Sequence, residues 1–258
     1  MKKPEVDLFI PCFIDQFYPQ TGFNMIKVLE KAGVKVHYNT EQTCCGHFAF
    51  NSGHWDEAKK LGEKFIKDFS RKRPVVGPSA SCIGYVRNNF DELFYNSAFH
   101  NDYKQLQRNI FEITDFLVNV LQITDFGSVF EHKVTYHDSC AALREYGLKE
   151  EPRILLRNVK GLELIEMKDT DTCCGFGGTF CVKYPEISNR MVENKSANVE
   201  LSGATTLLGG DLGCLLNMAG KLKRQGHNIE TRHIVEVLAG MTDEPAIGEA
   251  AYELGQSA

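Results

Sequence analysis

Residues 171–178 of this chain read Asp-Thr-Cys-Cys-Gly-Phe-Gly-Gly, and residues 43–46 carry a shorter copy, Thr-Cys-Cys-Gly. Each adjacent cysteine pair is flanked at a distance by one more cysteine on either side. The first set is Cys12, Cys44, Cys45 and Cys82, and the second is Cys140, Cys173, Cys174 and Cys214. Equivalent members lie 128 to 132 residues apart. Self-similarity at so long a period predicts two copies of one structural unit.

A short apolar run precedes each cysteine-bearing segment. In the first copy we expect strands at residues 6–10, 34–38 and 74–76 and helices at 23–33 and 54–69. In the second copy the corresponding strands are residues 134–136, 162–165 and 205–208, and the helices are 152–159 and 185–200. Strands that alternate with helices indicate parallel sheets with right-handed crossovers. The predicted fold class is therefore α/β, with two tandem pseudo-symmetric units, each a parallel sheet flanked by helices.

The boundaries follow from the repeat. Residues 103–121 have a helical apolar period, so we expect one helix there that bridges the units. The first unit with this helix then spans residues 1–131, and the second spans 132–240, closing with a strand near Ile229 and a helix at 233–238. Residues 241–258 carry several acids and no Lys or Arg, and we expect a disordered acidic tail.

The overall composition limits the partners. A net charge of −5 and a pI of about 5.9 give no basic footprint, so we expect no nucleic-acid partner. No apolar stretch is long enough for a transmembrane segment, and the run at residues 6–10 is too short for a secretion signal. We therefore expect a cytoplasmic protein with reduced thiols, in which repeated cysteine spacing indicates metal binding or catalysis.

Adjacent cysteines can serve one metal site only if the chain bends, and Gly46 and Gly175 supply that bend. Four thiolates suit zinc or an iron–sulfur cluster. Zinc knuckles have two to four residues between ligands, whereas here 31 to 39 residues separate each outer cysteine from the pair. This spacing favours up to two iron–sulfur clusters, of the [4Fe–4S] type, over zinc, with all eight paired cysteines as candidate ligands. A strained disulfide between adjacent cysteines is the other alternative.

The remaining candidates are weaker. Cys181 has no counterpart in the first copy, and we expect no role for it in the repeated site. His47 and His137 lie near the motifs, where either can contact a cluster or belong to its surroundings. Asp138 and Ser139 resemble helix-capping residues. The sequence contains no nucleotide loop and no Ser-His-Asp arrangement, so no catalytic residue is assigned.

At these motifs the chain resembles the cysteine-rich CCG-domain family of iron–sulfur proteins, found in one of the subunits of heterodisulfide reductase and in the iron–sulfur subunit of glycolate oxidase. Two such domains and nothing else are most similar to the lactate utilization protein A type, over residues 6 to about 240. Heterodisulfide reductase ends each repeat in Cys-x-x-Cys, whereas here the last positions are Tyr85 and Asn217. The loss of this fifth thiolate argues against a non-cubane double cluster and against disulfide reduction.

The resemblance implies an iron–sulfur electron-transfer subunit of a complex that oxidises L-lactate to pyruvate. It also implies two further subunits, a ferredoxin-like iron–sulfur protein and a third protein, and no activity of this chain alone. Two alternatives stay open: a thiol or disulfide reductase subunit, and a non-catalytic scaffold stabilised by zinc.

Overall fold

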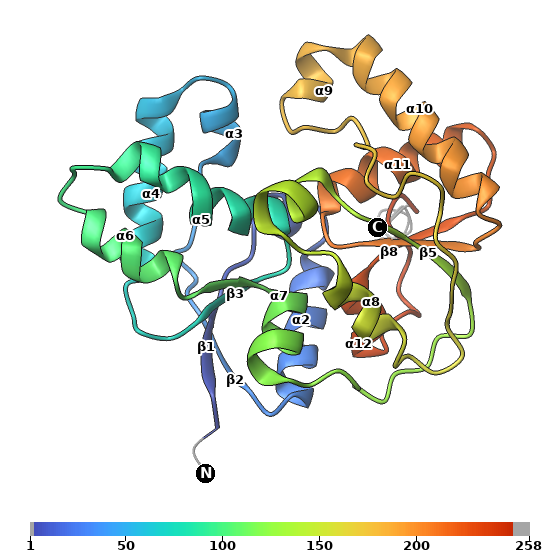
Figure 1. The fold of residues 1–258 in the computed structure, drawn as a ribbon, viewed down its shortest axis with the longest axis horizontal. Helices are drawn as coiled ribbons and strands as arrows, with labels where there is room; N and C mark the ends of the chain where they lie inside the picture. The colour runs from blue at the N-terminus through green and yellow to red at the C-terminus, as the bar shows by residue number, and fades with distance from the viewer. Residues whose placement is uncertain (1–2, 250–258) are drawn as a thin grey trace, which may run out of the picture.

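The computed structural model describes residues 3–249, which form two four-stranded sheets whose neighbouring strands are all parallel. The first has the order β2-β1-β3-β4, with β1 (Glu5–Leu8), β2 (Lys35–Tyr38), β3 (Val75–Gly77) and β4 (Ile110–Glu112). The second has the order β6-β5-β7-β8, with β5 (Lys133–His137), β6 (Glu163–Leu164), β7 (Thr206–Gly209) and β8 (Glu230–His233). The two orders correspond strand by strand (Figure 1), so the predicted α/β fold of two pseudo-symmetric units is confirmed.

Helices connect the strands in the same order in both units. The first unit has α1 (Cys12–Phe17), α2 (Pro19–Lys31), α3 (His47–Asn51), α4 (Trp55–Asp68), α5 (Ala80–Phe94) and α6 (His100–Gln107). The second has the π-helix η2 (Ala141–Tyr146), α8 (Glu150–Leu156), α9 (Phe180–Lys183), α10 (Pro185–Leu201), α11 (Leu212–Arg224) and α12 (Ile234–Ala239). Proline at the first position of α2 and of α10 presets the helical φ where no hydrogen bond is lost.

The expectation of one continuous helix at residues 103–121 is wrong. After α6, β4 joins the edge of the sheet, where Val75 of β3 pairs with Ile110. The chain then forms the short α7 (Ile113–Asp115) and the π-helix η1 (Phe116–Leu121). Glu112 makes the turn, since its carboxylate accepts hydrogen bonds from Thr114 N at 2.7 Å and Asp115 N at 3.2 Å. The apolar spacing fits a helix, but the open edge of β3 binds this backbone instead.

The expected disordered tail also needs correction where the structure describes it. Within residues 241–249, Ala246 and Ile247 are buried, and Ile247 N donates to Thr231 O at 2.8 Å. Burial of these two apolar side chains holds the segment against β8 despite its acidic composition. The rest of the expected tail, residues 250–258, lies outside the described residues.

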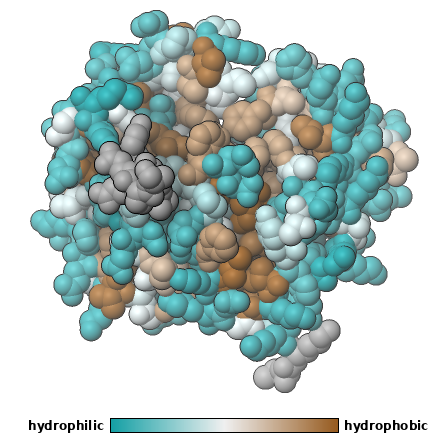
Figure 2. Space-filling model, turned by 180° about the vertical axis from the view of Figure 1, so that it is seen from behind, coloured by the Kyte–Doolittle hydropathy of each residue, from teal (hydrophilic) through white to brown (hydrophobic). Residues whose placement is uncertain are grey.

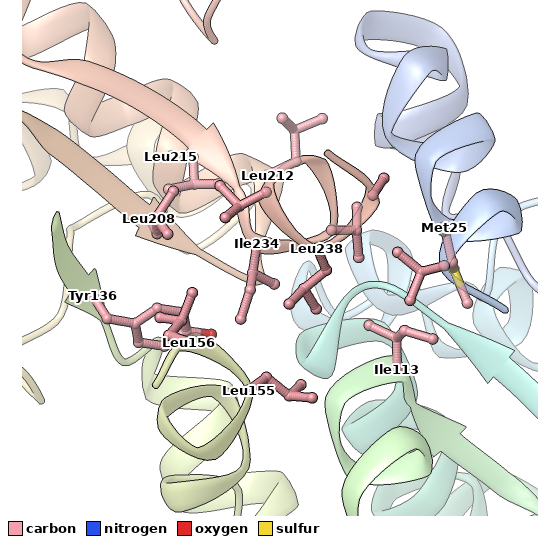
Figure 3. Packing of buried hydrophobic residues seen from close by; sticks show 14 of the residues in the cluster. Met25, Ile113, Tyr136, Leu155, Leu156, Leu208, Leu212, Leu215, Ile234 and Leu238 are labelled. Atoms are coloured by element: carbon pink, nitrogen blue, oxygen red, sulfur yellow. The ribbon is translucent and has the colours of Figure 1, made fainter. Parts of the chain in front are cut away.

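The two units share one hydrophobic core. Helix α2 of the first unit packs against α12 of the second, and α5 packs against η2. Figure 3 shows Met25 and Ile113 from the first unit in the same cluster as Leu155, Ile234 and Leu238 from the second. The division between residues 131 and 132 stays a prediction from the sequence repeat, and the hydrophobic cluster extends across it.

The surface is mixed. Figure 2 shows hydrophilic residues over most of the face opposite to that of Figure 1, with smaller apolar patches among them. Among residues 3–249, no helix combines the length and the apolar character that crossing a membrane requires.

The shared core predicts that damage in the second unit destabilises the first. Leu238→Ala should lower the free energy of unfolding by about 2–5 kcal/mol, because it leaves a cavity in the cluster. Trp55, the single tryptophan, lies in the first unit, and its fluorescence midpoint should fall together with that of the far-UV circular dichroism. Ile187→Ala, on the exposed face of α10, is the control and should change little. An unchanged Trp55 midpoint in Leu238→Ala would show that the units unfold independently.

Candidate metal centre

Three strand ends carry the first cysteine set. Cys12 begins α1 after β1, the pair Cys44 and Cys45 follows β2, and Cys82 is the third residue of α5 after β3. Because β2, β1 and β3 are adjacent and parallel, their carboxyl ends lie at one edge of the sheet. The fold therefore brings these four thiols together across 70 residues of sequence.

The second unit repeats the arrangement. Cys140 immediately precedes η2 after β5, the pair Cys173 and Cys174 follows β6, and Cys214 is the third residue of α11 after β7. The sulfur atoms of Cys140 and Cys173 lie 3.9 Å apart. The same edge of the second sheet thus holds the second quartet.

Within each quartet the thiols form a hydrogen-bonded series in the same order. The first series runs Cys12, Cys44, Cys45, Cys82, and the second runs Cys140, Cys173, Cys174, Cys214. Cys45 and Cys174 are the buried members, at 2% and 1% exposure. The repeat seen in the sequence is therefore also a repeat of side-chain contacts.

One thiol of each series has a lowered pKa and therefore ionises most readily. The hydrogen bond from Cys12, and then that from Cys45, lowers the pKa of Cys44 to about 3. The hydrogen bond between Cys173 and Cys140, and then that between Cys173 and Cys174, lowers the pKa of Cys173 to about 2. Backbone N–H groups of Gly46 and Gly175 add a contact of 3.4 Å to each of these sulfur atoms. Since metals bind the thiolate, each quartet presents a thiolate supported by neighbouring donors.

The glycines after each pair are required by backbone shape and by space. Gly46 has φ of +94° and Gly175 has φ of +81°, a region that residues with a Cβ rarely adopt. A Cβ on Gly175 would lie 2.7 Å from Ser188 O. The bend inferred from the sequence is present at both positions.

Both quartets face one cavity of about 170 Å³ between the units. Six of the eight paired cysteines line it: Cys12, Cys44, Cys45, Cys82, Cys140 and Cys214. Helix α3 and the loop before α9 border it from the two units, and the Ser52 hydroxyl meets that of Thr179 at 3.2 Å. Figure 1 shows α3 with α4 and α9 with α10 projecting to the same side of the molecule. The two thiol sets therefore lie near each other at the junction of the units.

Asp211 joins the units beside this cavity, a role that the sequence analysis did not predict. Its carboxylate accepts hydrogen bonds from the hydroxyls of Ser79 at 2.5 Å, of Ser81 at 2.8 Å and of Ser139. Ser79 and Asp211 are equivalent residues, each preceding the helix that carries the last cysteine of its unit. Their N-cap positions were the available signal, but their contact depends on how the units pack.

The two histidines differ in their surroundings. His47 is partly buried, stacks on Tyr85 with ring centroids 4.7 Å apart, and contacts the amide of Asn51 at 2.9 Å. His137 is 2% exposed, and burial lowers its pKa to about 4, so the ring is neutral at pH 7. A ring nitrogen of His137 and the sulfurs of Cys174 and Cys214 lie within 4.8 Å of one another.

Three further expectations have clear outcomes. Ser139 does act at a helix start, since its hydroxyl accepts from Ala142 N at 3.0 Å. The capping role expected for Asp138 is wrong, because its carboxylate accepts from both terminal nitrogens of the buried Arg153, at 2.8 and 2.7 Å. Cys181 donates to Gly178 O at 3.1 Å and does not line the cavity.

The donor chemistry fits a soft metal or an iron–sulfur cluster. Each quartet offers four thiols and a backbone bend, and it opens toward a cavity. Thiolate ligands favour zinc or iron–sulfur over hard cations such as Mg²⁺ and Ca²⁺. The residues present therefore suit a thiolate-bound metal centre in each unit.

Comparison with known proteins identifies relatives of this chain. Lactate utilization protein A of Oceanobacillus iheyensis is 43% identical over 238 residues, which cover 91% of this chain and 96% of that protein. Lactate utilization protein A 2 of Bacillus cereus is 41% identical over 236 residues, which cover 91% of this chain and 98% of that protein.

A crystal structure of a hypothetical protein from Helicobacter pylori matches the fold with a TM-score of 0.52 and 13% sequence identity. The match covers 98% of this chain, which spans about half, 53%, of the Helicobacter pylori chain. At this identity the likeness concerns the fold alone.

The model of the cysteine-rich domain named CCG matches twice, at residues 6–87 and 134–219. These two ranges contain all eight paired cysteines, and each covers three strands of one sheet while ending before the fourth, β4 or β8. The chain therefore belongs to the cysteine-rich CCG-domain family and, within it, to the group that contains lactate utilization protein A.

Proposed function

We propose that this chain is an iron–sulfur subunit of a multi-protein system that oxidises L-lactate to pyruvate, and that it transfers the electrons. The eight paired cysteines are the proposed ligands, with Gly46 and Gly175 in support. Two observations favour this function: the relatives carry the name lactate utilization protein A, and both thiol quartets face one cavity.

The shared cavity is the observation that carries the electron-transfer role. Oxidation of lactate to pyruvate releases two electrons and two protons. Each bound [4Fe–4S] cluster would supply a one-electron redox step. Two centres match the two electrons that lactate oxidation releases. Because both centres face one cavity, an electron would have a short path from one centre to the other.

Removal of hydrogen from the lactate carbon needs a group that accepts it, which in most enzymes is an organic cofactor. The sequence contains no Gly-x-Gly-x-x-Gly fingerprint of a dinucleotide site. We therefore assign the first step of the reaction to a partner. We propose two such partners, a ferredoxin-like iron–sulfur protein and a third protein.

One distance favours a second candidate, a scaffold stabilised by zinc. Zinc binds thiolates at about 2.3 Å, so tetrahedral geometry places two ligand sulfurs about 3.8 Å apart. The Cys140 and Cys173 sulfurs lie 3.9 Å apart. Thiols without metal can also approach this closely, so metal analysis decides between the candidates.

The first test is metal content after anaerobic purification. We expect iron and sulfide with broad absorbance near about 400 nm, as thiolate-bound iron–sulfur clusters give. Cys44→Ser and Cys173→Ser should each lower the iron content to about half, because each removes the ligand of one centre. Cys181→Ser is the matched control and should retain all the iron. Stoichiometric zinc without sulfide would establish the scaffold, and full iron content in Cys173→Ser would remove that residue from the ligand set.

The second test concerns lactate. The isolated chain should not reduce an artificial acceptor with L-lactate, whereas its deletion should abolish growth on L-lactate in a strain that depends on this pathway. In the deletion strain, a gene that encodes the Cys181→Ser protein should restore growth, whereas one that encodes the Cys173→Ser protein should not. Lactate-dependent reduction by the chain alone would overturn the electron-transfer role. Normal growth of the deletion strain would count against lactate and favour the disulfide-reductase alternative.

A further inference from the structure

The two thiol quartets have different neighbours although their backbones correspond. Phe9 lies three residues before Cys12, and His137 lies three residues before Cys140, so the two occupy equivalent positions. The ring of Phe9 packs edge-on against Phe65, with centroids 4.8 Å apart, in an aromatic cluster. The equivalent place in the second unit thus holds a polar ring with no such packing role.

His137 has no hydrogen-bond partner for either ring nitrogen among residues 3–249, although it is buried. Leaving both nitrogens of a buried imidazole unpaired costs free energy, so such a group normally has a partner. The nearest soft donors are the thiols of Cys174 and Cys214, which with a ring nitrogen of His137 lie within 4.8 Å of one another. A metal bound to these thiols would lie within reach of that nitrogen.

We propose that His137 is a nitrogen ligand of the metal at the second centre. This inference rests on the metal centres of the proposed function and revises the ligand set of one of them. Four thiols already match the four ligand positions of a [4Fe–4S] cluster, so His137 takes the place of one thiol of the second quartet, while the first centre keeps four thiolates. The neutral imidazole carries the lone pair that a metal requires. Phe9 offers no such donor to the first centre.

The surrounding contacts fix the backbone on both sides of this site. The next residue, Asp138, is fixed by the buried Arg153, whose guanidinium also binds Glu166 at 2.6 and 2.9 Å. The Lys195 ammonium donates to the carbonyls of Asp169 and Thr170 at 2.7 and 2.8 Å, which anchors the loop just before the paired cysteines. These contacts fix the positions of the two backbone segments that carry His137 and the cysteine pair.

Asn217 does not take this role. Its side-chain amide donates to Cys174 O at 2.9 Å, so it supports the backbone of the cysteine pair. In the first unit Tyr85 occupies the equivalent position as a fully buried ring stacked on His47. Asn217 lies in the helix after β7, whereas His137 is the last residue of β5, so the nitrogen donor comes to the second centre from a different strand end.

An imidazole donor changes the electronic character of the centre. A neutral nitrogen ligand places less negative charge on the metal than a thiolate, and histidine ligation raises the reduction potential of iron–sulfur centres. We therefore expect the second centre to have the higher potential and to be the better electron acceptor of the two.

The test uses the full chain reconstituted with iron and sulfide, reduced, and examined by pulsed EPR. Nitrogen bound directly to the centre gives a strong hyperfine coupling, and labelling all histidines with ¹⁵N changes its isotope signature without altering the protein. We expect that coupling in the wild type, its conversion on labelling, and its loss in His137→Phe, which places in this position the residue type found in the first unit. His47→Phe is the matched control and should retain it.

Each outcome decides the inference. If the wild-type protein contains full iron but shows only weak histidine nitrogen coupling, His137 donates a hydrogen bond to a sulfur atom and is not a ligand. That result overturns the ligand assignment. If the bound metal is zinc, the proposed iron–sulfur function is wrong, and the ligand role of His137 is tested on its own. X-ray absorption at the zinc edge then tests the ligand: we expect a nitrogen scatterer that is lost in His137→Phe, and four sulfur scatterers per zinc would overturn it.

Discussion

The side-by-side parallel packing of three strands is the constraint on which the rest of this structure depends. Strands β2, β1 and β3, and likewise β6, β5 and β7, end at one edge because they run in the same direction. The cysteines follow those ends, so four thiols meet without any local motif of closely spaced ligands. Each outer cysteine lies just before a helix or in its first turn, and the free N–H groups of that helix end favour negative charge near the sulfurs.

The second level is the joining of the units. The first crossover helix of each unit packs against the final helices of the other, and one apolar cluster extends through both. At the cavity, Asp211 binds serines from both halves, and His233 Nε2 lies 3.1 Å from Pro78 O and 3.0 Å from Gly210 O. These buried polar contacts fix the orientation of the sheet edges, which is why both thiol sets face the same space.

The repeat preserves the thiols and their glycines while the surroundings have diverged. Around the first set the structure places aromatic rings, among them Phe9, Phe65 and Tyr85. Around the second it places His137, Lys195 and the Arg153–Asp138 ion pair, all buried. Two sites with the same cysteine pattern in such different environments would bind the same kind of metal with different redox properties.

The sequence by itself determined the repeat, the α/β class, the grouping of eight cysteines and the separate status of Cys181, because each depends on spacing and composition along the chain. It misassigned residues 103–121, since the hydrogen-bonding edge of β3 competes with helical periodicity. It also missed the link from Asp211 to the serines, and it left the partnerless ring of His137 undistinguished from His47. Only the tertiary structure decided these, because a hydrogen bond between units, an exposed sheet edge or a buried unpaired nitrogen arises from residues far apart in sequence.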